Sequence, residues 1–435
     1  MKLQIVLSSL MFISVFCFPL VTKAKNIVVI LSDDHRYDFM SFMEESPEFL
    51  ETPNLDRLAK EGAHLTNAFV TTSLCSPSRA SILTGQYMRH HRVVDNQRPV
   101  PPGTMFFPEY LQEAGYQTGY VGKWHMGHED DNPRKGFDHW VSFAGQGTYF
   151  DPTFNINGKR KSFKGYNADL LTDQALSWLK KVGKASKNKK PFFLQVGYKA
   201  VHYPFQPPPR HAERYSGKKI DYPETMANTE ENYLSQSHWI RERRYGIHGI
   251  DHMETGALDK DPVPDFDELY HNFCETVHAL DENIGRILVQ LDELGIADDT
   301  LIIYLGDNGF ALGEHGFYDK RDAFEESIRI PMLARHPKLI EPGTKVEKMT
   351  LNVDIAPPFW NTQELHCQPT PRWTETRFFH YFREKSQSIN GVTISFMNTI
   401  GNGISRLLPL LLPSVRTRRN ISFITAYGTG TVFMI

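Results

Sequence analysis

Two apolar segments that each end in acidic residues constrain the fold of this chain more than any other feature. Residues 27–31 run into Asp33-Asp34, and residues 301–305 run into Asp307-Asn308. Short apolar runs rich in β-branched residues are typical of buried strands in α/β proteins. Because ligands in such folds bind at the carboxyl ends of parallel strands, we expect both acidic pairs at one edge of one sheet.

The rest of residues 25–356 alternates between strand-like and helix-like patterns, which predicts an α/β fold with a mostly parallel or mixed central sheet flanked by helices. Residues 205–264 lack periodicity and are expected to form a long surface insertion near the site. Two further strands are predicted at Gln117 to Val121 and Phe192 to Val196, and helices at Thr52 to Gly62, Ala168 to Lys181 and Phe266 to Leu294.

The acidic pairs supply only oxygen donors. Three carboxylates and one amide suit a hard divalent cation such as calcium better than zinc. Each residue alone could instead form a turn or cap a helix. Two equivalent pairs favour a calcium site made by Asp33, Asp34, Asp307 and Asn308.

Cys75 stands in a segment that can face an anion. Pro77 suits a first helical turn, which would place Cys75 just ahead of a helix N-terminus. Backbone N–H groups at such a terminus favour an anion, and Arg79, one turn later, can reach back to the same anion. The alternative is a buried structural cysteine, which is the usual role of a lone cysteine.

Basic side chains follow the other predicted strands. Lys123 and His125 come after the strand at 117–121, and in an extended segment they would face the same side. His202 follows the strand at 192–196, and Lys320 follows the second acidic pair. Such residues are usually solvated or structural, but gathered beside a metal they would bind a tetrahedral oxyanion.

Residues 1–24 combine a charged start, an apolar run and a small-residue cleavage site, which predicts a signal peptide and an exported protein, periplasmic or secreted. A membrane anchor is the alternative. No later segment is expected to cross a membrane once this peptide is cleaved. The net charge of −3 provides no global positive field for binding nucleic acid.

Several motifs in chain order resemble those of the type I, formylglycine-dependent sulfatases. The resemblance covers residues 25–356, the expected catalytic domain. Residues 136–158 are similar to its carbohydrate-active branch, the ulvan-active and N-acetylglucosamine-6-type sulfatases. Candidates for a sugar site are His90, His91, His139 and Tyr149; the alternative is that they are packing or surface residues. The motifs are Asp33-Asp34, Cys75-Ser76-Pro77-Ser78-Arg79 with Leu83-Thr84-Gly85, Gly122-Lys123-Trp124-His125, His202-Tyr203-Pro204-Phe205, Asp307-Asn308-Gly309, and His315-Gly316 with Lys320.

This resemblance implies an alkaline-phosphatase-like fold and the hydrolysis of sulfate esters on a polysaccharide. A formylglycine-generating maturation enzyme would oxidise Cys75, and the modified residue would join the two acidic pairs in binding calcium. His202 would protonate the leaving sugar oxygen, and His125 would help to remove a proton from the sulfated intermediate. The sulfate would be bound by Arg79, Lys123 and Lys320. The alternatives are a phosphoester or phosphonate hydrolase of the same superfamily, or an inactive relic.

Residues 357–435 depart abruptly from the family pattern. Back-translation in the frame one nucleotide earlier permits Thr-Phe-Leu-Glu-Tyr-Ala-Gly-Ile from residues 356–365, which is the usual family continuation. Two later stretches in the same frame are also family-like. We therefore expect a frameshifted tail here in place of the usual small C-terminal antiparallel-sheet subdomain.

Overall fold

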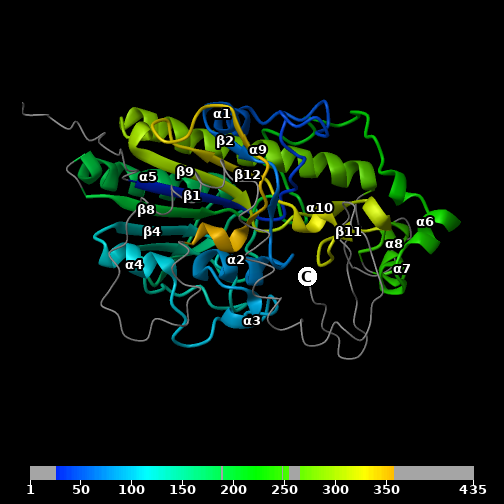
Figure 1. The fold of residues 1–435 in the computed structure, drawn as a ribbon, viewed down its shortest axis with the longest axis horizontal. Helices are drawn as coiled ribbons and strands as arrows, with labels where there is room; N and C mark the ends of the chain where they lie inside the picture. Colours follow the sequence, from blue (N-terminus) through cyan, green and yellow to red (C-terminus); the bar gives the residue numbers. More distant parts are fainter. Residues whose placement is uncertain (1–25, 188–189, 247, 254–264, 357–435) are drawn as a thin grey trace, which may run out of the picture.

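A ten-stranded mixed sheet forms the centre of the molecule, in the strand order β13-β2-β12-β9-β1-β8-β4-β5-β6-β7. The computed structural model describes residues 26–187, 190–246, 248–253 and 265–356 (Figure 1), so the expected signal peptide and tail lie outside the described residues. The five middle strands are mutually parallel: β9 (Thr300–Gly306), β1 (Asn26–Ser32), β8 (Phe192–Gly197), β4 (Gln117–Gly122) and β5 (His139–Ser142). The four strands predicted from the sequence are confirmed in this parallel core.

Antiparallel pairings flank this core on both sides and make the sheet mixed. On one side β12 (Met332–Arg335) is antiparallel to β9, β2 (Ala63–Leu65) is antiparallel to β12, and β13 (Thr344–Val346) closes the edge. On the other side β6 (Thr153–Ile156) and β7 (Lys159–Ser162) form a hairpin beside β5. Two small two-stranded sheets pair β10 (Ala311–Leu312) with β11 (Tyr318–Asp319), and β14 (Thr350–Leu351) with β3 (Ala68–Phe69).

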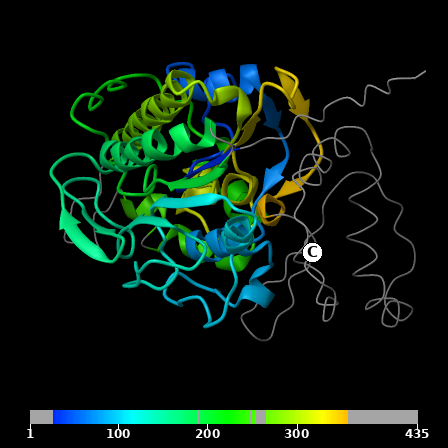
Figure 2. The same cartoon turned by 90° about the vertical axis from the view of Figure 1, so that its left-hand side faces the viewer.

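Helices cover both faces of the sheet (Figures 1 and 2). Successive side chains of β1 alternate between the two sides: Val28 and Ile30 join one apolar cluster, and Val29 and Leu31 join the other. The first cluster includes α1 (Pro53–Glu61), α5 (Asn167–Lys187) and α9 (Phe266–Glu293), and the second includes α2 (Cys75–Thr84) and α4 (Phe107–Glu113). The predicted helices are confirmed, and every described helix is too short or too polar to span a bilayer.

The insertion contains more regular structure than its sequence predicts. Three short helices form within it: α6 (Glu230–Ser235), α7 (His238–Arg244) and α8 (Ile250–Met253). They lie beyond the end of the sheet beside β11 in Figure 1, as expected for an insertion near the site. The remaining elements are α3 (Met88–His91), α10 (Glu325–Ile328) and the 3₁₀ turns η1 (Glu224–Met226), η2 (Ala297–Asp299), η3 (Glu314–Gly316) and η4 (Asn352–Ile355).

Candidate active site

The two acidic pairs meet at the carboxyl edge of the sheet because β1 and β9 are neighbours. Ser32 of β1 lies opposite Gly306 of β9, so the next residues leave the two strands side by side. The backbone N–H of Asp34 donates to Asp307 Oδ1 at 3.2 Å. The two pairs lie at one edge of the sheet, as the sequence predicts, and all four residues are fully buried.

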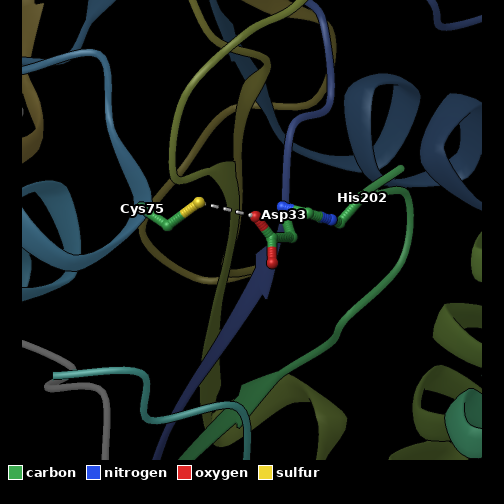
Figure 3. A group of neighbouring side chains, drawn as sticks. All are labelled: Asp33, Cys75 and His202. Carbon is green, nitrogen blue, oxygen red and sulfur yellow. Dashed lines mark hydrogen bonds between the residues drawn. The ribbon is translucent and has the colours of Figure 1, made fainter. Parts of the chain in front are cut away.

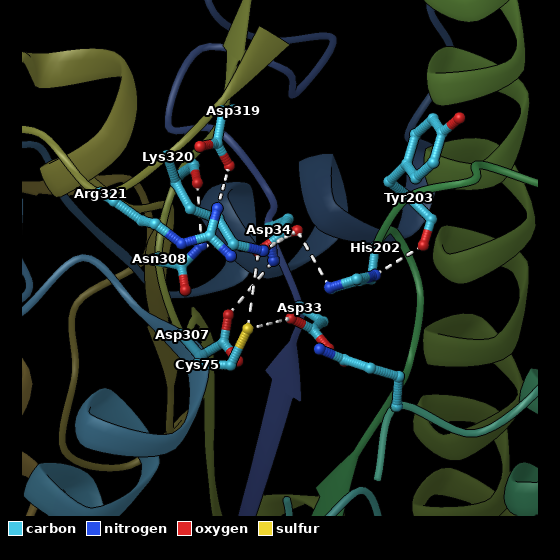
Figure 4. A network of polar contacts seen from close by, with 12 residues as sticks. Asp33, Asp34, Cys75, His202, Tyr203, Asp307, Asn308, Asp319, Lys320 and Arg321 are labelled. Carbon is cyan, nitrogen blue, oxygen red and sulfur yellow. Dashed lines mark hydrogen bonds and ion pairs between the residues drawn. The ribbon is translucent and has the colours of Figure 1, made fainter. Parts of the chain in front are cut away.

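Four acidic or sulfur-bearing side chains gather closely enough to bind one metal ion. Asp33, Asp34, Cys75 and Asp307 each offer a ligand atom, and these atoms lie within 4.8 Å of one another. Asn308 Nδ2 donates to Asp34 at 2.6 Å, whereas its Oδ1 is buried without a hydrogen-bond partner in the described structure (Figure 4). An orphaned carbonyl oxygen beside three carboxylates fits a hard cation such as calcium.

Cys75 is the first residue of α2, not the residue ahead of it as predicted. The helix begins one residue earlier than expected because extended Leu74 serves as its N-cap, and Pro77 still lies in the first turn. Cys75 Sγ donates to Asp33 at 3.3 Å, with His202 on the other side of Asp33 (Figure 3). Burial and the charge of Asp33 raise the pKa of the Cys75 thiol, so the unmodified side chain is a poor nucleophile.

Arg79 links α2 to the acidic pairs from the next turn of the helix. Its Nε donates to Asp307 at 2.8 Å and its Nη1 donates to the Lys123 carbonyl oxygen at 2.7 Å. Its Nη2 is buried and has no hydrogen-bond acceptor among the described residues. Burial lowers the pKa of Arg79, but the negative charges of Asp307 and Asp33 outweigh this effect and raise the pKa overall. The guanidinium is therefore charged, and its Nη2 donor is free to bind an anion.

Lys123, just after β4, and Lys320, just after β11, both contact the acidic pairs. Lys123 Nζ contacts Asp33 and the side-chain oxygen of Gln146, and Lys320 Nζ contacts Asp34. Burial alone would raise the pKa of Asp33, but Lys123 and the other cations hold it well below its usual range. The sequence predicted no site role for Gln146, although this residue lies within residues 136–158, the segment similar to the carbohydrate-active branch; the glycines on both sides of it have positive φ.

His125 reaches the same site by a different backbone path from the one predicted. The segment after β4 is not extended, because Gly122 has φ 132° and His125 has φ 60°. Burial and the charge of Lys123 hold the pKa of His125 far below its ordinary value, so the ring is neutral. Its Nδ1 is buried without a hydrogen-bond partner in the described structure.

His202 is held in one tautomer by the backbone. Its Nδ1 donates to the Tyr203 carbonyl oxygen at 2.6 Å, which leaves Nε2 facing Asp34 at 3.8 Å (Figure 4). Tyr149 also donates from its hydroxyl to the His202 carbonyl oxygen. Burial and the charge of Lys320 lower the pKa of His202, so Nε2 is unprotonated here and can exchange a proton at this edge.

The structure therefore brings together every catalytic and metal-binding residue predicted from the sequence. Of the sugar-site candidates, Tyr149 lies beside His202, but His91 is hydrogen-bonded to Ser81 and His139 stacks on Trp178. His139 is in β5 opposite Gly119, in the first half of β4, and so does not reach the carboxyl edge. A second residue that the sequence did not single out is Lys199, which is only 3% exposed and lies close to this group.

Comparisons with known proteins agree with this geometry. The Sulfatase family model matches residues 25–361. An N-acetylglucosamine-6-O-sulfatase of Bacteroides thetaiotaomicron is 32% identical, over 83% of this chain and 75% of that protein. An ulvan-active sulfatase of Formosa agariphila is 28% identical, over 77% of this chain and 59% of that protein. A solved structure of a protein in complex with its substrate D-glucosamine-2-N,6-O-disulfate is 32% identical with a TM-score of 0.64, covering 77% of this chain and 76% of the other.

Proposed function

Since this chain belongs to the sulfatase family, we propose that it hydrolyses sulfate esters of a sulfated carbohydrate. The observation that carries the proposal is the position of Cys75, at the start of a buried helix between three carboxylates and three cations. The alkaline-phosphatase-like sulfatase fold predicted from the sequence is confirmed by the family match and the related structure.

The relatives support a sulfated sugar as the substrate class. One relative is named for N-acetylglucosamine 6-O-sulfate, one for ulvan, and one is complexed with a doubly sulfated glucosamine. We therefore propose an algal polysaccharide or a glycosaminoglycan as the substrate, with a sulfated glucosamine as the first sugar to test.

The nucleophile would come from residue 75. The pKa of the thiol is raised by burial and by Asp33, so the side chain cannot act well as a thiolate. Oxidised to formylglycine by a maturation enzyme, it would instead supply a hydrated aldehyde oxygen. His125, neutral and buried, would accept a proton from this residue when the sulfated intermediate collapses.

The charged residues would bind the sulfate and stabilise its transition state. Arg79 has an unused Nη2 donor, and the ammonium groups of Lys123 and Lys320 lie beside the carboxylates. The acidic pairs and the modified residue 75 would hold calcium, which would supply positive charge to the nucleophile and to the sulfate oxygens. His202 would act through Nε2, since its Nδ1 proton is held by the Tyr203 carbonyl oxygen. Because Nε2 is unprotonated in the free site, it would first take a proton from water when the negatively charged sulfate ester binds, and would then pass that proton to the leaving sugar oxygen.

Mass spectrometry of the tryptic peptide containing Cys75, from protein made in its own host, tests the proposal first. Conversion of the thiol to the aldehyde lowers the mass by about 18 Da. Sulfate release from N-acetylglucosamine 6-sulfate should then exceed phosphate release from the matched phosphate ester. Faster phosphate release would favour a phosphoester hydrolase, and an unmodified cysteine in an inactive protein would favour an inactive relic.

We also propose that the protein is exported to the periplasm or secreted, with residues 1–24 removed. N-terminal sequencing of protein recovered from outside the cytoplasm should begin at Lys25. Recovery of the intact N-terminus from a membrane fraction would instead favour an anchor.

A further inference from the structure

Among the buried Arg and Lys residues described at the site, Arg79, Lys123 and Lys320 each form an ion pair with a carboxylate, and Lys199 does not. Within the described residues, Lys199 is 3% exposed and forms no ion pair with a carboxylate within 4.0 Å. A lysine in a mostly buried position without an anionic partner is unfavourable. The site carboxylates instead form ion pairs with the other cations: Asp307 with Arg79 at 2.8 Å, Asp33 with Lys123, and Asp34 with Lys320.

Lys199 lies on the side of the site that holds His202. Its Nζ is 4.7 Å from the ring centroid of Tyr149, and the Tyr149 hydroxyl donates to the His202 carbonyl oxygen. The Lys199 carbonyl oxygen accepts from the His202 backbone N–H at 2.9 Å. Because His202 is the group proposed to face the leaving sugar, Lys199 lies next to the residue on the sugar side of the site.

The charge of Lys199 is poorly stabilised by the protein itself. Burial and the positive charge of Lys123 lower the pKa of Lys199 to about 8, although Asp33 and Asp34 act in the opposite direction. The ring of Tyr149 offers a cation–π contact, which is weaker than a paired carboxylate. A group with this environment would be stabilised by an anion that arrives with the substrate.

We propose that Lys199 binds a second sulfate group, carried by the same sugar as the scissile sulfate ester. This inference rests on the proposed function and narrows its substrate class to doubly sulfated sugars. Lys199 would contribute specificity, whereas Arg79, Lys123 and Lys320 would bind the sulfate that is cleaved.

Binding measurements test this without requiring turnover. In a Cys75→Ala background with calcium present, calorimetry compares N-acetylglucosamine 6-sulfate with glucosamine 2-N,6-O-disulfate. Lys199→Met should weaken binding of the disulfate at least about tenfold more than binding of the monosulfate, since a hydrogen bond to a charged group is lost. Lys199→Arg, which keeps the charge, should preserve most of the preference, and Lys218→Met is the matched control at an exposed lysine.

Equal weakening of both sugars by Lys199→Met would overturn the role of Lys199 and leave the proposed function standing. Binding of neither sugar by the Cys75→Ala parent would contradict the proposed substrate, and the Lys199 role with it. Thermal unfolding of each variant shows whether it is folded, and Lys199→Arg provides the comparison if Lys199→Met does not fold.

Discussion

At the scale of single residues, substitution of Asn308 tests most directly whether the site binds calcium. The Oδ1 atom is buried without a partner in the described structure, while the Nδ2 atom is held by Asp34 and by the Gly309 carbonyl oxygen. The amide is therefore oriented with its oxygen available as a ligand. A buried acceptor left unpaired costs stability, and a bound cation would remove that cost.

We predict that saturating calcium raises the unfolding temperature of the wild-type protein, and that Asn308→Ala reduces this increase. Calcium at 100 times its dissociation constant stabilises a folded protein by about 2.7 kcal/mol. A tenfold weaker site would lose about 1.4 kcal/mol of that stabilisation. Calorimetry of each protein with calcium and with chelator measures the difference, and the exposed Asn132→Ala is the control. An equal increase in Asn308→Ala would exclude Asn308 as a ligand.

The residues proposed to carry the chemistry could be predicted from sequence because they stand in motifs directly after strands or at a helix start. Gln146 and Lys199 could not, because neither has a motif of its own. Gln146 reaches Lys123 through a loop after β5, and Lys199 is buried in contact with the Tyr149 ring. Their roles depend on tertiary packing between segments that the sequence keeps apart.

At the scale of elements, one helix is capped by another. Thr52, the N-cap of α1, makes no capping hydrogen bond to the helix backbone. Instead Asp281 of α9 accepts from the backbone N–H of Leu55 at 2.7 Å and from the backbone N–H and side-chain amide of Asn54. Unpaired N–H groups at a buried helix terminus are costly, so this contact fixes α1 against α9.

We predict that Asp281→Ala lowers the free energy of unfolding by about 2–3 kcal/mol, because several buried donors lose their acceptor. Asp281→Asn keeps one carbonyl oxygen and should cost about 1 kcal/mol. The control is Asp292→Ala, which removes an exposed ion pair between α9 and Arg57 and should cost less than about 1 kcal/mol. Urea unfolding measures all three, and equal losses in Asp281→Ala and Asp292→Ala would contradict the capping role.

Element boundaries followed closely from sequence where periodicity was strong. The strand predicted at 192–196 is Phe192–Gly197, and the helix predicted at 266–294 is Phe266–Glu293. The helices α6, α7 and α8 were not predicted, because they have too few turns to show an apolar period. Contacts such as the Arg243 ion pair with Asp319 stabilise them instead.

For the whole molecule, we predict a loss of stability on acidification. Burial lowers the pKa of four histidines to about 4, so the unfolded chain binds more protons than the folded one between their ordinary pKa near 6.5 and pH 4. Their contribution is complete above about pH 6.5 and is lost as the pH falls toward 4. The four are His35, His64, His91 and His336.

Each of these histidines contributes a slope of up to about 1.4 kcal/mol per pH unit in that window. Asp281 and Asp307 act in the opposite direction, because burial raises the pKa of each to about 7. The histidines outnumber them, so the free energy of unfolding should fall from pH 7.5 to pH 5 in urea titrations. His64→Gln should flatten this dependence, and an unchanged slope would show that His64 is charged in the folded protein.

The last whole-molecule prediction concerns the expected frameshift. The part of the chain just before residue 357 packs against α2: Asn352 donates to Ser78 Oγ at 2.9 Å and accepts from the Thr71 backbone N–H at 3.1 Å. Ile355 and Ala356 are buried in the same apolar cluster as α2. If residues 357–435 are a frameshifted tail, the helix that carries Cys75 does not depend on them.

Truncation after Ala356 should therefore change the free energy of unfolding by less than about 1 kcal/mol. Truncation after Met349 removes Asn352 and Ile355, and should cost at least about 2 kcal/mol, because an acceptor on α2 and the backbone donor of Thr71 become unpaired and apolar surface is exposed. Urea unfolding compares the three chain lengths. A large loss from the first truncation would mean that residues 357–435 stabilise the catalytic domain, and would contradict the frameshift hypothesis; sequencing of the gene across codons 350–365 would test it independently.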